Sequence, residues 1–433
     1  MASGLRNFNS VLISKILMLI LALGTQIILA RFLGPEGRGS YAVCIMLAGL
    51  LNIIFIPACD VAIVYFVSSG RMNLSEGLIY AFIYGIIGSA VAISAGFILI
   101  QFPLTIFEKA DLSSFYLAYI SIPFSLFALV FSRLLTATGD FLWFSFSTIL
   151  IRLLQLLLVL FLIGVFSLGV KGALFAVIIS AMITILFSLV ILNRKYDLRF
   201  VKPQMGKLVN MIHYGLRYYI GKISNLANVK IGTIILSFFA TRAQIGFFDI
   251  AVQLGTKTML IPDALITVLT PKVAKYKEST KDLVAMCSRL TGIISFFMLL
   301  VLTVFANQIV ITLFSSEFLL VVPLLRVIAI GVLIRSISKV FVPYLLGTDH
   351  PGIISIGVSL GTIINLVLLW VLLPVIGLIA GGLAITAGYI VSSAIIIVAF
   401  KNVSRLGFKE IFKVKRSDFS FLRLVTKKGR FNQ

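Results

Sequence analysis

Basic side chains occur within the long apolar segments of this 433-residue chain, where charge is costly. On membrane-insertion scales, one charge at the centre of a spanning helix costs about 2.5–3.5 kcal/mol. Seven or eight of them facing lipid would cost on the order of 20 kcal/mol, so we expect them to face inward, toward a cavity that water can enter. The basic members of this set are Arg31, Arg152, Lys222, Lys230, Lys257, Arg335 and Lys339.

Acidic side chains in the same segments are fewer, namely Asp60 and Asp263. They can pair with some of the bases or couple transport to an ion, but two carboxylates cannot neutralise the whole basic set. The surplus of positive charge indicates a site that holds an anion. For single residues, structural ion pairing is an alternative. Arg31 and Lys339 lie near segment ends, from which long side chains can also reach the membrane surface.

The spacing of these residues places several of them on shared helical faces. Arg335 and Lys339 are four residues apart, so they lie one turn apart on the same side of a helix. Lys222, Asn225 and Lys230 fall within one broad stripe. We therefore predict helices whose polar side faces a wet cavity.

The elements that position these residues are membrane helices, as the composition requires. The chain is 60% hydrophobic and only 12% charged, whereas soluble domains carry about 25% charged residues. The excess of 37 Lys and Arg over 15 Asp and Glu does not indicate nucleic acid, because no soluble domain is available to carry a basic stripe. Basic cytoplasmic connectors explain the excess better.

A spanning helix needs about 20 mainly apolar residues, and the chain contains about twelve such segments. The basic connector 193–211 divides them into an N-lobe, 1–192, and a C-lobe, 212–400, followed by a basic tail, 401–433. Since Lys and Arg accumulate in alternate connectors and in the tail, both termini are predicted to be cytoplasmic. The segments are 10–32, 41–67, 77–101, 115–137, 142–166, 171–192, 212–239, 247–271, 284–313, 322–346, 353–374 and 377–400.

An internal repeat supports two related halves. The stretch Ile27–Ala42 joins the first two segments through a connector rich in glycine, and Ile234–Ile250 is a weaker copy in which Gly246 aligns with Gly39. Because each half has an even number of helices, both enter the membrane from the same side. We predict two six-helix lobes related by a pseudo-twofold axis along the membrane normal, facing a central cavity.

Two prolines lie at similar distances after these matched glycines. Pro57 and Pro262 are expected at a similar depth in the second and eighth segments. Proline kinks a helix, and such kinks can serve gating, although membrane helices also tolerate proline without a functional reason.

No residues in the sequence indicate an enzyme, a metal site or a cofactor. Cys44, Cys59 and Cys287 are scattered through apolar segments and are interpreted as small buried hydrophobes. His213 and His350 are too far apart in the chain to suggest metal binding. A glycine-rich phosphate loop is also missing, which argues against intrinsic ATP hydrolysis.

The first connector resembles that of a known family of transporters. Ala30–Arg31, Leu33–Gly37, Gly39 and Tyr41–Ala42, together with Lys415–Asp418 in the tail, are similar to the bacterial polysaccharide-repeat flippases, the O-antigen and exopolysaccharide translocases. These belong to the multidrug/oligosaccharidyl-lipid/polysaccharide exporter superfamily. The second connector departs strongly from this pattern.

The resemblance implies a two-lobed transporter in the bacterial cytoplasmic membrane. By this resemblance it moves an undecaprenyl-pyrophosphate-linked oligosaccharide to the outer leaflet by alternating access, with cavity cations meeting the pyrophosphate. The implied partners are this lipid-linked oligosaccharide, membrane lipids, and the polysaccharide polymerase and glycosyltransferases. No nucleic acid, cofactor or metal is implied.

Other functions remain as alternatives. A lipid II or teichoic-precursor flippase would carry a similar anion. A multidrug antiporter exports cations and would need acids in its cavity, for which only Asp60 and Asp263 are candidates. A membrane glycosyltransferase or polymerase would need a sizeable outer loop with catalytic residues, and the connector near Glu108–Asp111 is too short.

Overall fold

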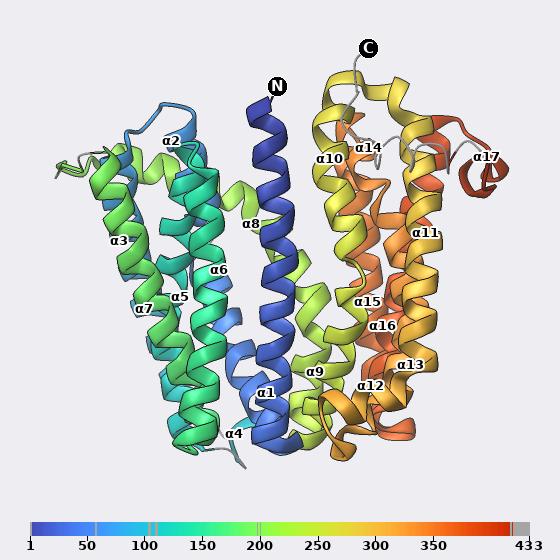
Figure 1. The fold of residues 1–433 in the computed structure, drawn as a ribbon, viewed down its shortest axis with the longest axis horizontal. Coiled ribbons are helices and arrows are strands. Elements are labelled where there is room, and N and C mark those ends of the chain that lie inside the picture. The colour runs from blue at the N-terminus through green and yellow to red at the C-terminus, as the bar shows by residue number, and fades with distance from the viewer. Residues whose placement is uncertain are drawn as a thin grey trace. The chain divides into compact units, whose positions relative to one another are not determined.

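The computed structural model describes residues 2–56, 59–102, 105–108, 111–196, 198–199, 201–415 and 418. Over these ranges the chain forms helices joined by turns, with no strand (Figure 1). Nine of the helices in the described ranges are long and apolar enough to cross a membrane. The predicted class is therefore confirmed: this is an all-α, multi-pass membrane protein.

The helices follow one another along the chain with short connections. The first part contains α1 (Ala2–Phe55), α2 (Cys59–Ser68), α3 (Leu74–Gln101), α4 (Thr105–Glu108), α5 (Leu112–Ala137), α6 (Phe141–Val159), the π-helix η1 (Leu160–Val165), α7 (Gly169–Tyr196), α8 (Met205–Phe239) and α9 (Arg242–Lys257). The second part contains α10 (Leu260–Tyr276), η2 (Lys277–Thr280), α11 (Lys281–Val304), α12 (Ala306–Leu313), η3 (Ser316–Phe318), α13 (Val321–Lys339), α14 (Val342–Gly347), α15 (Pro351–Ile376), α16 (Ile379–Ser404) and α17 (Phe408–Phe412).

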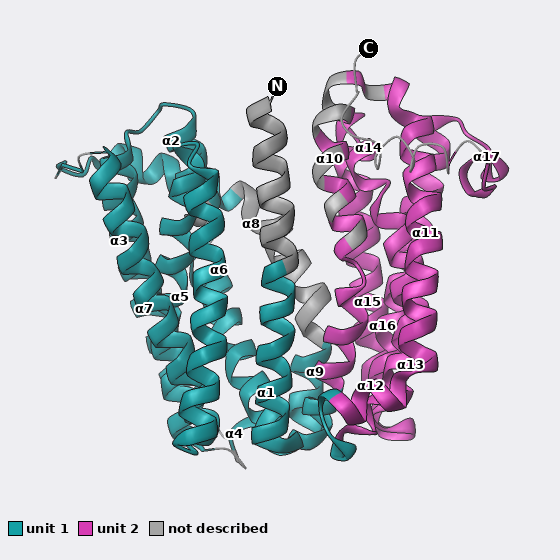
Figure 2. Cartoon of the chain, viewed as in Figure 1, with its two compact units in different colours: residues 1–247, 313–317 teal, residues 248–312, 318–433 magenta. Residues whose placement is uncertain are grey.

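These helices form two compact units, coloured separately in Figure 2. Unit 1 comprises Met1–Phe247 and Leu313–Glu317, and unit 2 comprises Phe248–Thr312 and Phe318–Gln433. Unit 1 continues past the basic connector because α8 packs on α1, α2 and α4. The lobe boundaries 1–192 and 212–400 stay predictions.

Each predicted spanning segment coincides with one helix or with two consecutive helices. The first two segments meet inside α1, which consists of two helical stretches separated at Gly34, where φ is 64° and ψ is −178°. This positive φ is a conformation that glycine adopts readily and other residues rarely do. Pro35 then begins the second stretch, where its missing N–H breaks no helical hydrogen bond.

The predicted segment 247–271 is interrupted in the same region as its proline. It forms α9 and α10, which are separated at Thr258 and Met259. Pro262 lies in the first turn of α10 and is buried. A proline ring clashes with the carbonyl four residues earlier, here that of Thr258, so the break falls where this clash is avoided. Pro57 lies outside the described residues.

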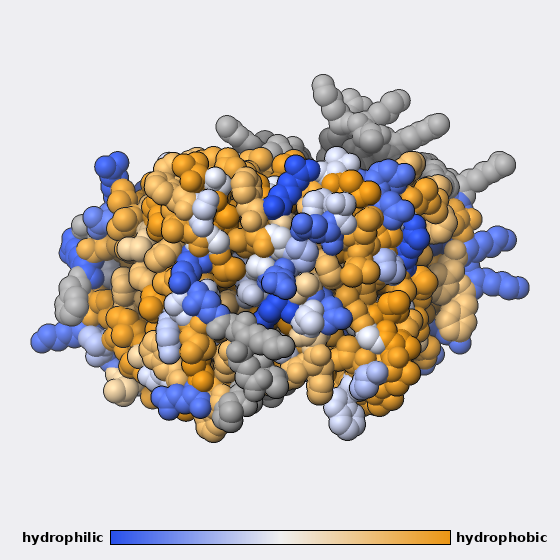
Figure 3. Space-filling view, turned by 90° about the horizontal axis from the view of Figure 1, so that it is seen from below, coloured by the Kyte–Doolittle hydropathy of each residue, from blue (hydrophilic) through white to orange (hydrophobic). Residues whose placement is uncertain are grey.

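The outer sides of the helices are strongly apolar. On α15, Ile356, Ile363 and Trp370 recur every two turns and are 57%, 52% and 67% exposed. Such a stripe is stable only against lipid, because monomeric soluble proteins rarely expose apolar patches of this extent. Figure 3 views the molecule from below, and there hydrophilic residues interrupt a largely hydrophobic surface.

The opposite face of α15 packs against α16 through glycines. A Cβ atom added to Gly361 would lie 2.5 Å from the carbonyl oxygen of Gly388, and one added to Gly388 would lie 2.6 Å from that of Gly361. Small residues allow this close backbone approach, which stabilises helix pairs in membranes.

The two copies of the internal repeat contact each other within unit 1. A Cβ atom added to Gly39 would lie 1.6 Å from the carbonyl oxygen of Arg242. One added to Gly246 would lie 2.5 Å from the carbonyl oxygen of Pro35 and 3.1 Å from the backbone nitrogen of Gly39. The matched glycines are therefore required by one tight backbone contact.

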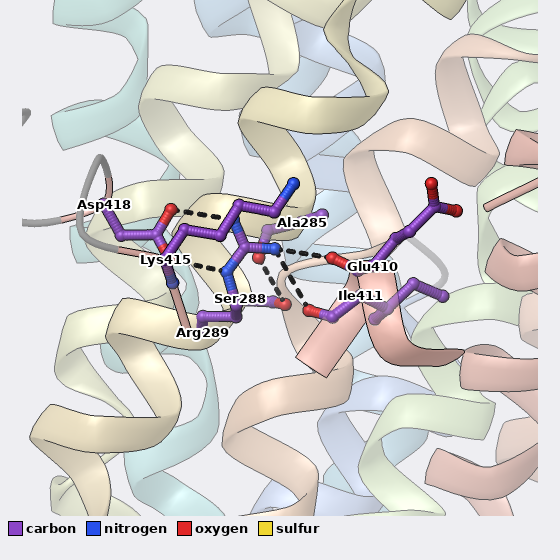
Figure 4. A network of polar contacts seen from close by, with 7 residues as sticks. All are labelled: Ala285, Ser288, Arg289, Glu410, Ile411, Lys415 and Asp418. Atoms are coloured by element: carbon purple, nitrogen blue, oxygen red, sulfur yellow. Dashed lines mark hydrogen bonds and ion pairs between the residues drawn. The ribbon is translucent and has the colours of Figure 1, made fainter. Parts of the chain in front are cut away.

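In unit 2, the chain after α16 is fastened to α11 by a buried ion pair (Figure 4). Arg289 Nε and Nη2 donate to the Asp418 carboxylate at 2.7 and 2.8 Å, and Nη1 donates to the carbonyl oxygens of Glu410 and Ile411 at 2.8 and 3.3 Å. The backbone N–H of Lys415 also donates to Asp418. The two side chains of the pair are 5% and 2% exposed. Sequence analysis did not identify this pair, because its members are 129 residues apart.

We expect Gly246→Ala to destabilise unit 1, because the added methyl group meets a backbone carbonyl that has no free rotation. Overpacking of this kind costs about 1–3 kcal/mol, so the thermal midpoint of the purified protein in detergent should fall by several degrees. Gly49→Ala is the matched control, since Gly49 lies within helix α1 with nothing within 4 Å of an added Cβ. Equal melting of the two variants would contradict the close contact.

Hydrogen bonds from Arg289 hold the pKa of Asp418 below its usual range. The carboxylate therefore ionises more readily in the folded protein than in the unfolded chain, where its pKa is about 3.9. The contribution of this carboxylate to folding stability is complete above about pH 4, and it is lost as the pH falls through the lower pKa of the folded state. We expect Asp418→Asn to lower hydrogen-exchange protection of residues 408–415 at pH 7, with the difference from the wild type shrinking in acid.

Breaking one partner of a buried ion pair costs about 3–5 kcal/mol, so the loss of protection at pH 7 should be large. Asp282→Asn provides the control, because Asp282 is an exposed acid in the first turn of the same helix, α11. If the two variants show equal hydrogen-exchange protection of residues 408–415, the Arg289–Asp418 pair does not hold this segment.

Candidate functional site

The candidate site in unit 2 is a polar seam along α13. Arg335 and Lys339 lie one turn apart on this helix, as their spacing predicted. Arg335 Nη1 donates to the hydroxyl oxygen of Ser392 on α16 at 3.1 Å. Lys339 Nζ forms an ion pair with Asp263 on α10. Three members of the predicted charged set are therefore close together.

The seam forms because α13 and α16 meet through small and hydroxyl-bearing residues. A Cβ atom added to Gly331 would lie 2.8 Å from the Cα of Thr386, whose hydroxyl donates to the carbonyl of Val327 at 2.9 Å. About two turns further along both helices, Ser338 Oγ on α13 donates to Ser393 Oγ on α16 at 2.8 Å, and both residues are buried. This polar lining places Arg335 beside hydroxyl groups.

Arg335 and Lys339 differ in their direct contacts. The Lys339 charge is balanced by the Asp263 carboxylate, whereas among the described residues no carboxylate pairs with Arg335. Hydroxyl groups accept a hydrogen bond from a guanidinium without cancelling its charge. The seam therefore keeps a cation whose planar fork fits phosphate and carboxylate groups.

Other predicted residues occupy separate elements. Arg31 is exposed at the end of the first stretch of α1, and its Nε donates to the carbonyl of Leu313 at 2.9 Å. Arg152 is exposed on α6 and donates to Gln155 Oε1 at 3.2 Å. Lys257 ends α9 and is half-buried.

Four of the predicted residues have side chains that lie outside the described part of the structure. Lys222 and Lys230 belong to α8 and Asp60 to α2, but their side chains lie outside the described residues. Pro57 lies outside them entirely. Their roles in a cationic site stay predictions.

Sequence analysis missed two arginines near the repeated connectors in unit 1. Arg38 is 1% exposed and its Nη2 donates to Gln26 Oε1 at 2.6 Å. Arg242 donates to the carbonyl of Ile106 and lies over the ring of Phe115, 6.0 Å from its centroid. Both belong to the two copies of the repeat, which is the signal that could have identified them.

Arg242 also borders a cavity of about 280 Å³ in unit 1, together with Ser40, Asp111 and Lys171. Lys171 Nζ pairs with Asp111 at 3.1 Å. Hydrogen bonds from Ser113, with the contribution of Lys171, hold the pKa of Asp111 below its usual range. Lys171 and Asp111 balance each other, so the surplus positive charge of this cavity is that of Arg242.

Comparisons with known proteins agree with this architecture. The chain is 21% identical over 200 residues to the probable low-salt glycan biosynthesis flippase Agl15 of Haloferax volcanii, covering 45% of this chain and 42% of that protein. The matched region thus spans less than half the length of this relative.

Solved transporters share the fold over nearly the whole chain. The lipid II flippase MurJ, in an inward closed conformation, superposes with a TM-score of 0.74 at 14% identity, covering 96% of this chain and 92% of that one. An inward-facing multidrug resistance MATE family transporter of the MOP superfamily gives 0.73 at 17% identity, covering 90% and 94%. At these identities the likeness concerns the fold.

The sequence pattern of one family matches more than half of the chain. Residues 5–277 fit the family described as polysaccharide biosynthesis protein. This range contains the first connector, its weaker copy and Asp263. The fold of the chain is similar to those of a lipid II flippase and a MATE family transporter, and the chain belongs to the polysaccharide biosynthesis protein family.

Proposed function

We propose that this protein moves a lipid-linked oligosaccharide with a pyrophosphate head, such as an undecaprenyl-pyrophosphate-linked repeat unit, to the outer leaflet of a bacterial cytoplasmic membrane. The observation that carries the proposal is the α13 seam, where Arg335 is held by a hydroxyl group and where none of the described carboxylates forms an ion pair with it. Membership of the polysaccharide biosynthesis family and the flippase relative support it.

The chemistry of the seam fits a phosphate group. A guanidinium donates two parallel hydrogen bonds to phosphate oxygens, and charge-assisted bonds of this kind are about twice as strong as neutral ones. Ser392 already positions one edge of Arg335, which leaves other donors of the fork for an anion. An arriving phosphate would also compete with Asp263 for Lys339, so substrate binding and the Lys339–Asp263 pair are coupled.

The remaining predicted cations complete this proposal. In an alternating-access cycle with both termini cytoplasmic, further phosphate or sugar-acid contacts come from Arg31, Arg152, Lys222, Lys230 and Lys257. A polysaccharide polymerase and glycosyltransferases are the proposed protein partners.

The membrane potential supplies a driving force for this direction of movement. An inside-negative potential favours outward movement of an anion by about 2.3 kcal/mol per charge per 100 mV. ATP is not required if the pyrophosphate crosses with part of its charge uncompensated. A coupled cation, for which Asp263 is the described candidate, is the other source of energy.

Three other functions are ranked behind this one. A lipid II or teichoic-precursor flippase would meet the same cations, because those substrates also carry phosphate groups. A multidrug resistance transporter shares the fold. However, Asp263 is already paired with Lys339, so less negative charge is available to bind a cationic drug. A membrane glycosyltransferase or polymerase is the non-transport alternative.

The central test replaces Arg335 by glutamine and measures flipping of a pyrophosphate-linked glycolipid in proteoliposomes. Truncating one partner of a hydrogen-bonded charge pair costs about 2–5 kcal/mol, so we expect transport to fall by at least about tenfold. Arg326→Gln is the matched control, because Arg326 lies on the same helix and is exposed. Equal transport by the wild type and Arg335→Gln, at equal reconstitution, would refute the role of Arg335.

A second experiment addresses the energy source in the same proteoliposomes. We expect an imposed potential, negative on the side from which substrate is taken, to accelerate flipping by the wild-type protein. A potassium gradient with valinomycin sets the potential, and vesicles without the gradient serve as the control. Transport that ignores both the potential and cation gradients would contradict this mechanism.

A further inference from the structure

A second basic cavity lies in unit 1, where α2 ends and α8 begins. Its volume is about 380 Å³. This part of unit 1 is held together by contacts between distant segments, since Tyr80 Oη and the backbone of Gln204 exchange hydrogen bonds. The cavity is lined by Phe66, Arg71, Met72, Lys207, Asn210, His213 and Tyr214.

Aromatic rings position the principal cation of this cavity. The guanidinium of Arg71 lies over the ring of Tyr65, 5.4 Å from its centroid. Tyr65 in turn stacks on Tyr214, with centroids 4.2 Å apart and an angle of 9° between the rings. Because Tyr65 belongs to α2 and Tyr214 to α8, this stack joins the two walls of the cavity.

In the described part of the chain, no acidic side chain forms an ion pair with Arg71. Its contact there is the ring of Tyr65. Lys207 differs, because its Nζ pairs with Glu76 at 2.5 Å. Glu76 also accepts a hydrogen bond from the backbone N–H of Asn73, as part of the cap of α3. The ion pair therefore fixes Lys207 at the cavity wall, and Arg71 supplies the surplus positive charge.

The rest of the polar lining can donate hydrogen bonds. Lys207, Asn210 and Tyr214 recur at helical spacing, so they share one face of α8, and His213 lies beside them. An amide and an imidazole can each donate an N–H. Phe66 and Met72 are buried apolar neighbours, which suits the chain of a lipid next to its polar head.

We propose that this cavity binds the phosphate head of a lipid, with Arg71 as its main contact and Asn210 and His213 as further donors. The chemistry fits two sources: the pyrophosphate of the transported lipid, or a phosphatidylglycerol of the surrounding membrane. Assignment to the first source rests on the proposed function. In that case the cavity receives substrate on the cytoplasmic side, separately from the α13 seam.

Binding is measured with the full-length protein in phosphatidylcholine nanodiscs. Radiolabelled farnesyl pyrophosphate is one probe, and phosphatidylglycerol retained in native mass spectrometry is the other. Both are tested in the wild type and in an Arg335→Gln background, which removes the main cation of the α13 seam. Failure of that seam therefore cannot be mistaken for failure of this cavity.

We expect Arg71→Gln to weaken binding of one probe by about tenfold, the equivalent of one charge-assisted hydrogen bond. Arg71→Lys should restore part of the loss because it keeps the charge. Lys202→Gln is the matched control, since Lys202 is an exposed base in the preceding connector and does not line the cavity.

The pattern of losses identifies the source. A loss for farnesyl pyrophosphate assigns the cavity to the transported lipid, and a loss for phosphatidylglycerol alone assigns it to the membrane. Asn210→Ala gives a second variant that keeps every charge if Arg71→Gln folds poorly. Unchanged binding of both probes in Arg71→Gln or, where that variant fails to fold, in Asn210→Ala would overturn the proposal.

Discussion

A charged side chain that folding removes from water must be matched by a partner or must serve a ligand, and this constraint governs the structure. Unit 2 contains both cases. Arg289 is matched by the Asp418 carboxylate and by two backbone carbonyls, so its donors are occupied by the protein itself. Arg335 donates a hydrogen bond to Ser392, and no carboxylate in the described part of the chain forms an ion pair with it. The first arrangement is structural, and the second is suited to an anionic ligand.

Close helix packing provides the rigid frame for these charges. Backbones approach through glycines at the connector contact of Gly39 with Gly246 and at the α15–α16 contact of Gly361 with Gly388. Lipid tails are as apolar as leucine side chains, so helices in a membrane associate through such fitted surfaces and not through a hydrophobic drive. The same principle brings α13 and α16 close enough for the Ser392 hydroxyl to accept a hydrogen bond from Arg335.

Two basic features, one in each unit, suit the same kind of ligand by different means. The α13 seam in unit 2 uses the Ser392 hydroxyl group to hold the Arg335 guanidinium. The cavity between α2 and α8 in unit 1 uses stacked tyrosine rings beneath Arg71. Neither arginine is matched by a carboxylate within the described part of the chain, and both cations have the planar fork that recognises phosphate. A transporter of lipids with phosphate heads has a use for both.

The sequence by itself determined the class of the protein, the helices and the repeat, because these depend on local properties. Apolar length sets a spanning helix, Gly34 and Pro35 set a break, and helical periodicity places Arg335 and Lys339 on one face. The partners of charged side chains depend on contacts between distant residues. Only the tertiary structure could therefore decide that Lys339 pairs with Asp263, that Arg289 is occupied by Asp418, and that Arg71 joins α8 through the tyrosine stack. Hydrophobic periodicity specifies which face of a helix is polar, but the helix that packs against that face is decided by the fold.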